Sequence, residues 1–389
     1  MTPAIIGWGH SAFGKLQGET VESLIVSVAC EALAHAGVAA RDVDEMVLGH
    51  FNAGFSEQDF TSALILQADP GLRFKPATRT ENACASGAAA VFQGVRAIEA
   101  GRARIVLVVG AEKMTDATGP QVGRNLLRAA YLAGEEGGDA GFAGVFGTIA
   151  EAYFARHGDQ SEALAKIAVK NHANGMFNPF AQLHKPLTLD FCMTDSERNP
   201  RVAGPLRRSD CSPVSDGAAA LVIADAETAR TMRRAIAFRG MSHVQDYLPL
   251  ARRDILEFEG CMRAWRAALG EAKISLDDLS FVETHDCFTI AELLEYEAMG
   301  LAAPGRGADA IHEGRVLPGG KLPVNLSGGL KAKGHPIGAT GVSMHVLSSA
   351  QLCGEAPAEV QVADPKLAGI FNMGGAGVAN YASILERVR

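Results

Sequence analysis

Two cysteines and two histidines stand in surroundings that suit nucleophilic and acid/base chemistry. The first is Cys84, in the segment ACASG, at a turn that should open an alanine- and glycine-rich helix. Unsatisfied amides and the helix dipole at such a start give a thiol thiolate character. A buried, inert cysteine explains the same segment equally well, because a lone cysteine near a turn is a modest signal.

The second candidate is His335, which stands between Gly334 and Pro336 in the block GGLKAKGHPIGATG. Proline after a histidine biases that histidine away from helical geometry, so an extended turn should present the imidazole. Histidine is the obvious base to activate a cysteine. Considered alone, a loop histidine bonded to backbone is the more common explanation.

The third piece is the segment FVETHDCF, which places His285 and Cys287 at the end of an expected strand, just before an amphipathic helix. Two titratable groups two residues apart at the carboxyl end of a strand suit acid/base work. Packing explains them equally well when the segment is considered alone.

The pattern of strands and helices that must position these groups predicts an α/β protein. Apolar runs rich in Val, Ile and Leu, such as RIVLVVGAE, alternate with alanine-rich helical stretches, including an expected helix from about Ser86 to Ala100. From about residue 116 to 205 the pattern changes to glycine-rich, mixed-charge stretches with some helical segments. This length predicts a functional insertion over the core.

A weak internal repeat divides the chain. The segment EALAHAGVAARDVDEMVLGH resembles RAALGEAKISLDDLSFVETH, and the acidic residues before each strand, Asp42 and Asp278, are 236 positions apart. A tandem duplication would account for the length. The predicted halves are residues 1–240, which include the insertion, and residues 241–389.

Composition excludes several classes of protein. The net charge of −8 and the lack of a basic tail argue against nucleic acid as a partner. No apolar run is long enough to span a bilayer and the opening segment does not read as a leader, so we expect a cytoplasmic protein without a membrane partner. Seven scattered cysteines without zinc spacing predict reduced thiols and no metal site: Cys30, Cys84, Cys192, Cys211, Cys261, Cys287 and Cys353.

Taken together, these motifs resemble the thiolase superfamily over essentially the whole chain. The shared segments include ACASG, GAEKM, DCSPVSDGAAALV, HDCF, GGLKAKGHPIGATG and the terminal NMGGAG. HDCF together with the GHP motif is similar to the sterol-carrier-protein-type thiolases, which are acetyl-CoA acyltransferases. The resemblance implies two similar βαβαβαββ halves in a layered α-β-α-β-α core with a large loop insertion.

The resemblance also implies roles. Cys84 would be the acylated nucleophile and His335 its base, and the amides of Cys84 and of Gly374 or Gly375 would hold the acyl oxygen. The terminal block lacks the cysteine of the familiar thiolases and has Phe371, Asn372 and Met373 at the candidate positions. In the family with HDCF, the cysteine of that motif stands in for it. Cys287 would therefore be the second acid/base, and His285 would help hold an oxyanion.

The implied reaction is thiolytic cleavage of 3-oxoacyl-CoA, or the reverse Claisen condensation, in fatty-acid and lipid metabolism. Coenzyme A is a substrate, and no cofactor is bound. The resemblance implies a homodimer or homotetramer, with a small zinc-ribbon/OB-fold protein as a further possible partner. It also suggests that part of the insertion lines the pantetheine and acyl tunnel, with no assigned phosphate ligand: Lys170, Asn171, His172 and Lys185.

Other readings remain open at this stage. A thiolase-like aldolase acting on steroid side-chain CoA esters needs no cysteine nucleophile, and a 3-oxoacyl synthase would use Cys-His-His chemistry. A catalytically idle acyl-CoA-binding scaffold is the alternative from a different class. Among other marked residues, Asp210 and Asp216 are expected to cap turns, Cys211 to be structural, and Asn325 and Ser327 to brace the loop that bears His335.

Overall fold

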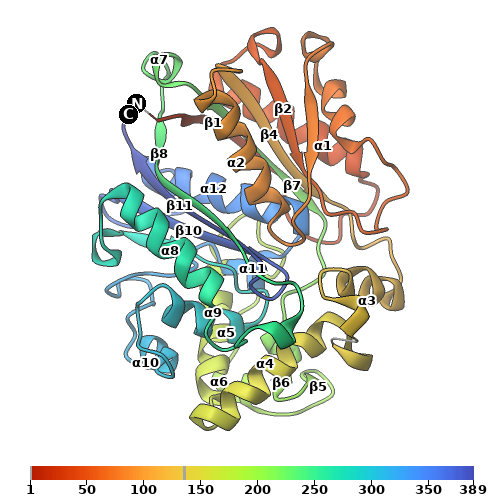
Figure 1. Cartoon of the computed structure of the whole chain (residues 1–389), viewed down its shortest axis with the longest axis vertical. Coiled ribbons are helices and arrows are strands. Elements are labelled where there is room, and N and C mark those ends of the chain that lie inside the picture. Colours follow the sequence, from red (N-terminus) through yellow and green to blue (C-terminus); the bar gives the residue numbers. More distant parts are fainter. Residues whose placement is uncertain (1, 135–136) are drawn as a thin grey trace.

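The computed structural model describes residues 2–134 and 137–389 and has two halves with the same order of elements (Figure 1). The N-terminal half contains β1 (Ala4–His10), α1 (Val21–Ala36), β2 (Glu45–Gly49), β3 (Ala77–Thr80), α2 (Ser86–Glu99), β4 (Ile105–Glu112) and β7 (Gly217–Ala224). The C-terminal half contains β8 (Ile236–Gln245), α8 (Glu259–Ala272), β9 (Phe281–Glu283), α9 (Thr289–Ala298), α10 (Gly307–His312), α11 (Gly329–Lys333), α12 (Ile337–Cys353), β10 (Leu367–Gly374) and β11 (Ala379–Arg387).

The strand order shows the duplication directly. The N-terminal strands are ordered β3-β2-β4-β7-β1, and the C-terminal strands continue the same sheet as β8-β11-β10-β9. Val324 makes a parallel bridge to Val282 on the outer side of β9, in the place that β3 occupies beside β2. Both halves therefore follow one order, and a short antiparallel pairing of Ala4 and Ile5 in β1 with β8 joins them.

The predicted repeat is also present in detail. Asp44 accepts hydrogen bonds from the amides of Arg104 and Ile105, where β4 begins. Ser280, 236 positions later, accepts the equivalent bonds from the amides that open β10. In both halves, therefore, a polar side chain accepts hydrogen bonds from the amides at the start of the equivalent strand, β4 or β10. The boundary predicted between residues 240 and 241 falls inside β8.

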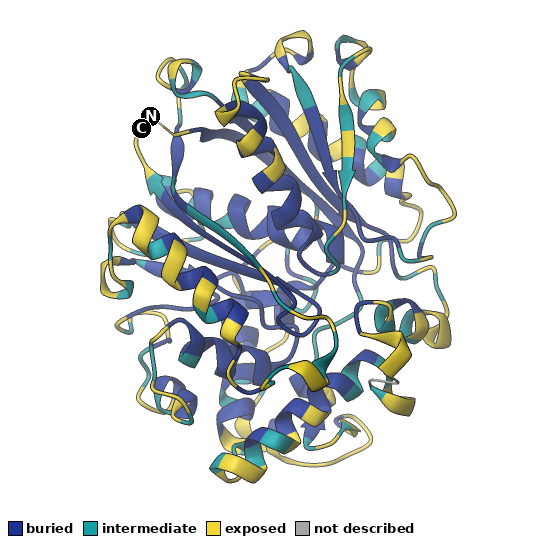
Figure 2. Cartoon of the chain, in the orientation of Figure 1, coloured by how far each residue is buried: buried dark blue, intermediate teal, exposed yellow. Residues whose placement is uncertain are grey.

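Helices form layers on and between the half-sheets. Helix α1 packs on β1, β4 and β7, and α8 packs on β8 and β11, whereas α2 and α12 pack against each other in the middle. Figure 2 shows α12 buried along nearly its whole length. The central helices approach closely because their contact residues are glycines: a Cβ on Gly87 would lie 2.7 Å from the carbonyl oxygen of Gly338. The α/β layered fold predicted from the sequence is confirmed.

The insertion covers one end of this core, at the bottom of Figure 1. It contains α3 (Gly119–Leu127), α4 (Gly141–His157), α5 (Ser161–Gly175), α6 (Leu189–Met193) and β5 (Arg201–Ala203), followed by β6 (Leu206–Arg207). Helix α5 packs against α9 and α11, the elements that flank the motifs of the C-terminal half. In residues 2–134 and 137–389, no helix combines the length and apolar character needed to cross a bilayer.

Candidate active site

Cys84 lies on a strained turn at the start of α2. Ala83 has a left-handed backbone (φ 48°), and the amides of Ala85 and Ser86 donate to the carbonyl oxygens of Asn82 and Ala83. The hydroxyl of Ser86 also donates to the Ala83 carbonyl. Left-handed geometry costs an alanine free energy, so surrounding contacts must impose it. The turn holds the Cys84 side chain inside the protein, 4% exposed.

His335 lies in the turn before α12, and its tautomer follows from its neighbours. The hydroxyl of Thr340 donates to the carbonyl oxygen of Pro336, 3.0 Å away, so it has no proton left for the imidazole. The 2.6 Å contact between Nδ1 of His335 and this hydroxyl therefore has Nδ1–H as the donor. Nε2 then carries the free electron pair, and this buried atom has no hydrogen-bond partner in the described chain. His335 is built as a base.

His285, just after β9, has the opposite tautomer because of Asn372 on β10. The side-chain NH2 of Asn372 donates to the carbonyl oxygen of Cys84 at 3.1 Å, which fixes the orientation of the amide. The same NH2 lies 2.8 Å from Nδ1 of His285, which must accept. The proton is then on Nε2, a second buried atom without a partner in the described residues. His285 is built as a hydrogen-bond donor.

These three groups converge on one point. One ligand-type atom from each of Cys84, His285 and His335 lies within 4.8 Å of the other two, and the imidazole rings meet edge-on, 5.1 Å apart. A thiol and two imidazoles at this spacing could in principle hold a metal ion. The tautomer of His285 opposes it, since its Nε2 proton occupies the ligand position and Asn372 blocks the alternative tautomer. The arrangement instead offers a nucleophile, an acceptor and a donor.

Cys287 lies beside this group. It is 3% exposed, its carbonyl oxygen accepts from the amide of Ser212 at 2.9 Å, and a thiolate at Cys84 would raise the pKa of its thiol beyond the larger effect of burial. The structure thus brings all four sequence-predicted side chains together: Cys84, His285, Cys287 and His335.

Burial keeps the resting site uncharged. It raises the pKa of the Cys84 thiol to about 12, although the amides of Gly375 and of Cys84 itself act in the opposite direction. Burial and the charge of Lys333 lower the pKa of His335 to about 3. Burial also holds the pKa of His285 well below its usual value and that of Cys287 well above. A neutral thiol and a neutral imidazole must therefore exchange the proton during attack, rather than rest as an ion pair.

Gly374 and Gly375 close the site at the end of β10. A Cβ on Gly374 would lie 2.1 Å from the carbonyl oxygen of Asn82, so the strand end touches the turn that carries Cys84. Gly375 has a left-handed backbone (φ 62°), and its amide is close enough to lower the pKa of the Cys84 thiol. Both predicted glycines therefore lie at the nucleophile.

Buried carboxylates hold the surrounding loops and were not singled out from the sequence. Glu112, at the end of β4, accepts from the amides of Phe51, Asn52 and Gly338, each 3.0 Å away. It thereby ties the start of α12 to the loop after β2. Asp286 accepts from the amides of Leu330 and Lys331 and fixes α11. Their signals were the motifs GAEKM and HDCF, but only the fold shows which amides they meet.

Asp210, Asn325 and Ser327 have the structural roles expected of them, whereas Asp216 does not cap its own turn but binds the segment after β4. Asp216 accepts from the amides of Met114 and Thr115 and from Lys113. Asp210 accepts from the amide of Arg207 at 2.7 Å. Asn325 accepts from the amide of Thr284, and Ser327 bonds twice to Glu283, so both residues connect the loop leading to His335 with the end of β9.

A basic cavity of about 540 Å³ lies between the insertion and the turn before β7. Its wall includes Ser212, whose amide donates to the carbonyl oxygen of Cys287. It also includes Val214, which precedes Ser215, and the hydroxyl of Ser215 accepts from the amide of His335. Among the residues that the structure describes, its lining has no acidic side chain and has six basic or imidazole side chains: Lys15, His172, Lys185, Arg198, Arg208 and Lys331. Cys211, expected to be structural, also lines it. The cavity suits a substrate with several negative charges.

Lys170 and Asn171, which were expected to line the substrate tunnel, do not line this cavity. Lys170 forms an ion pair with Glu292 at 2.7 Å, and Asn171 donates to Asp286 and Glu292. Both residues face the interior of the protein because the helix α5 that carries them packs on α9 and α11. His172 and Lys185 do line the cavity.

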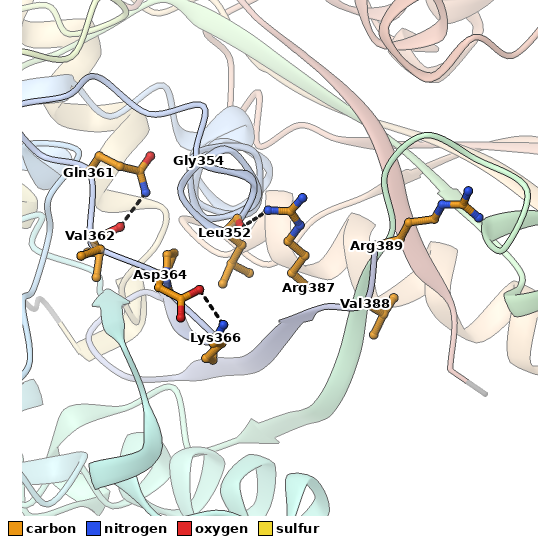
Figure 3. Close-up of a pocket in the computed structure, with 11 residues that line it drawn as sticks. Leu352, Gly354, Gln361, Val362, Asp364, Lys366, Arg387, Val388 and Arg389 are labelled. Atoms are coloured by element: carbon orange, nitrogen blue, oxygen red, sulfur yellow. Dashed lines mark hydrogen bonds and ion pairs between the residues drawn. The ribbon is translucent and has the colours of Figure 1, made fainter.

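A second cavity, of about 580 Å³, lies at the C-terminal edge (Figure 3). Its charged groups are partnered locally: Lys366 bonds to Asp364, and Arg387 donates to the carbonyl oxygen of Leu352. None of Cys84, His285, Cys287 and His335 lines it. Size alone does not identify the reactive cavity here.

Comparisons with known proteins identify the family of the chain. Residues 4–227 match the family described as thiolase, N-terminal domain, and residues 242–387 match the thiolase C-terminal domain-like family. The chain is 35% identical to an acetyl-CoA acetyltransferase of Methanothermobacter thermautotrophicus, with 99% of each chain covered. It is 30% identical to human sterol carrier protein 2, over 96% of this chain and 70% of that protein.

Two solved structures share the fold. A structure titled Ltp2-ChsH2(DUF35) aldolase aligns over 100% of this chain and 98% of its own, with a TM-score of 0.83 and 24% identity. Human mitochondrial 3-ketoacyl-CoA thiolase in complex with CoA aligns over 99% and 98%, with a TM-score of 0.73 and 20% identity. At these identities, the likeness concerns the fold.

Proposed function

Because this chain belongs to the thiolase family, we propose that it is a CoA-dependent acyltransferase that cleaves 3-oxoacyl-CoA, or forms it by condensation, through an acyl group on Cys84. The observation that carries the proposal is the pair of opposite imidazole tautomers at the Cys84 thiol. A Claisen-type reaction needs a base for the nucleophile and a donor for the enolate oxygen. Nε2 of His335 and Nε2–H of His285 supply these two functions.

In the cleavage direction, the Cys84 thiol attacks the keto carbon of the substrate while its proton moves to Nε2 of His335. The new tetrahedral oxygen lies within reach of the amides of Cys84 and Gly375. Such preorganised donors are typically worth about 10²–10³ in rate each. The raised pKa of the thiol makes this coupled proton transfer necessary, because a free thiolate is scarce at neutral pH.

Collapse of the tetrahedral intermediate breaks the carbon–carbon bond and leaves an acyl group on Cys84. The leaving enolate of acetyl-CoA, or of propionyl-CoA from a 2-methyl substrate, is protonated at carbon by Cys287. His285 donates to its thioester oxygen. Coenzyme A, deprotonated by the Cys287 thiolate, then attacks the acyl-cysteine, and the Cys84 sulfur leaves and takes its proton back from His335. The raised pKa of Cys287 suits an acid that must hold its proton until the enolate forms.

The basic cavity is where we place the CoA portion of the substrate. Its cationic side chains complement the phosphates of CoA, and Ser212 and Val214 lead from it towards the reacting groups. Replacing Lys185 and Arg198 with alanine should raise KM for CoA more than it changes kcat, because these residues are expected to touch the carrier and not the reacting atoms.

A direct test mixes the purified protein with acetoacetyl-CoA, longer 3-oxoacyl-CoAs and free CoA, and follows loss of the 3-oxoacyl chromophore and formation of acyl-CoA products. Turnover with at least one chain length is the expected result. Absence of turnover across all chain lengths, with folded protein, would contradict the proposal.

An aldolase is the second candidate, since a structural neighbour with a TM-score of 0.83 is titled an aldolase complex with a DUF35 component. A retro-aldol cleavage needs no cysteine nucleophile. Cleavage of a 3-hydroxyacyl-CoA that survives in Cys84→Ala would favour this function. A requirement for an added small zinc-ribbon/OB-fold protein would point to a similar complex.

We also propose a homodimer that pairs two copies through the edge strand β3. This strand ends the sheet order in the described chain, and Phe60 and Phe74 near it are 84% and 87% exposed. Unpaired strand edges and exposed aromatic rings favour association. Light scattering should give twice the monomer mass, and Ala77→Pro, which removes an amide on the free side of β3, should give monomer; a wild-type monomer would refute the dimer.

A further inference from the structure

Four lysines have side chains that are nearly or fully buried, and they fall into two pairs. Lys113 bonds to Asp216 at 3.0 Å and Lys170 to Glu292 at 2.7 Å, so each ammonium has a carboxylate partner. Lys331 and Lys333 have only neutral hydrogen-bond partners: His172 for the first and Ser343 for the second. No carboxylate in the described chain lies within 4.0 Å of either ammonium.

The two unpaired lysines lie on α11, in the segment that leads to His335. Lys331 lines the basic cavity, where a negatively charged substrate would meet it. Lys333 is 0% exposed and lines no part of that cavity. Its charge therefore needs a different explanation.

Lys333 is held in one place. Its ammonium donates to the hydroxyl of Ser343, 3.1 Å away on α12, and lies 6.0 Å from the ring centre of Phe13. The hydroxyl in turn contacts Nε2 of His10 at 2.7 Å, and Nδ1 of His10 contacts the carbonyl oxygen of Ser11 at 2.6 Å. This chain of neutral groups orients the ammonium without neutralising it.

The charge of Lys333 reaches the reacting groups. Burial is the main reason why the pKa values of His335 and His285 are lowered, and the charge of Lys333 lowers both further. Lys333 is also only two positions before His335 in the chain. Burial lowers the pKa of Lys333 itself, whereas the buried carboxylates Glu283 and Asp286 act in the opposite direction and favour the charged ammonium. Each carboxylate is also engaged elsewhere, Glu283 with Ser327 and Asp286 with the amides of α11. The positive field at the two imidazoles is therefore only partly offset.

A buried cation without a counter-ion costs stability, and a buried titratable group beside reacting side chains is a candidate for function. In the reaction proposed above, negative charge appears twice beside His335 and His285, on the tetrahedral oxygen and on the enolate. We propose that Lys333 is a positioning residue that supplies a fixed positive field for these anions, so that its counter-ion is the transition state. This inference rests on the proposed function. It predicts that the enzyme accepts a cost in stability in order to keep the charge.

The first test compares Lys333→Met with the matched variant Lys170→Met. Methionine has a similar length and no charge. Removing an unpaired buried charge should leave the thermal midpoint unchanged or higher, whereas Lys170→Met leaves Glu292 unpaired and should lower it. A fall in Lys333→Met as large as that in Lys170→Met would show a structural role and overturn the proposal.

The second test measures alkylation of Cys84 by iodoacetamide from pH 6 to 10, with peptide mass spectrometry to separate the cysteines. The field should favour the thiolate, so Lys333→Met should slow alkylation of Cys84 at pH 8 by about 10-fold or more. The exposed Cys30 should react at the same rate in both proteins and serves as an internal reference. An unchanged rate profile for Cys84 would overturn the proposal.

This readout requires no turnover. If wild-type protein fails to cleave any 3-oxoacyl-CoA while Lys333→Met still slows alkylation, the proposed function fails but the field at Cys84 stands. If wild-type protein turns over and Lys333→Met keeps both full kcat and full alkylation, only the role of Lys333 is lost. In the expected case kcat falls by about 10- to 100-fold with little change in KM.

Discussion

The two halves of the molecule share one plan and contribute opposite things to the site. In the N-terminal half, Gly49 on β2 pairs with Gly110 on β4. In the C-terminal half, the equivalent strands β9 and β10 pair Glu283 with Ile370. Two residues further along, just past the end of β9, His285 lies level with Asn372. Where one half has two glycines, the other has the donor imidazole and the amide that fixes its tautomer.

The glycines have a purpose that the comparison makes clear. A Cβ on Gly110 would lie 2.4 Å from the carbonyl oxygen of Gly338, and one on Gly49 would lie 2.6 Å from that of Ser86. The N-terminal half leaves room for the starts of both central helices. The C-terminal half fills the equivalent space with reactive side chains. A duplicated fold thus becomes a single site by losing side chains on one side and gaining them on the other.

Among Cys84, His285, Cys287 and His335, only Cys84 comes from the N-terminal half, so its replacement is the most severe test of the comparison. Cys84→Ala should abolish both acylation and cleavage, with a loss on the order of 10⁴-fold or more, because no other group is placed to attack. Steady-state thiolysis measures this. Residual cleavage above about 1% of wild type would mean that the nucleophile lies elsewhere.

His335 is the base from the C-terminal half. His335→Ala should lower kcat by about 10²–10⁴-fold, the range for loss of a positioned general base. Thr340→Val removes only the acceptor for Nδ1–H and should cost less, since the ring remains but its tautomer is free. Equal losses in the two variants would show that the ring packs rather than titrates.

The donor pair is next in size. His285→Ala should lower kcat by about 10²–10³-fold through loss of the enolate donor. Asn372→Ala should cost about 10-fold, because the imidazole stays while its tautomer is no longer fixed. Thiolysis at saturating CoA reads both effects. A larger loss in Asn372→Ala than in His285→Ala would reverse the roles assigned to the two residues.

Features of the fold and site that depend on neighbouring residues in the chain could be predicted from the sequence, whereas those that depend on contacts between distant segments could not. Cys84, His285, Cys287 and His335 stand in local motifs, and the strands and helices around them follow from apolar periodicity, as with the expected helix from Ser86 and the observed α2. The surroundings of Lys170 and Asn171 could not be inferred, because the sequence does not show which face of α5 packs against α9 and α11.

Asn372 shows the limit most clearly. The terminal block showed what was missing, a cysteine, but not what the asparagine does there. Its function depends on contacts with Cys84 and His285, which lie 288 and 87 positions away along the chain. The same holds for Lys333, whose lack of a carboxylate partner is a property of the packed interior and not of the motif.

The smallest expected effect is the dependence of the thermal midpoint on pH. Burial lowers the pKa of His335 and His10 to about 3 and that of His172 and His345 to about 4. The unfolded chain binds these protons near pH 6.5, so the stabilisation is complete above that pH and is lost as the pH falls towards 3 to 4. The thermal midpoint should therefore fall steadily from pH 7 to pH 4, by a smaller step in His345→Gln. A midpoint independent of pH over this range would show that these imidazoles are not buried neutral groups.

The central claim is that Cys84 carries the acyl group while Cys287 handles the proton of the enolate. Cys287→Ala separates the two steps. Incubated with acetyl-CoA and analysed by peptide mass spectrometry, this variant should carry an acetyl group on Cys84 while failing to cleave acetoacetyl-CoA. Absence of acetyl on Cys84, or cleavage at the wild-type rate, would contradict the account.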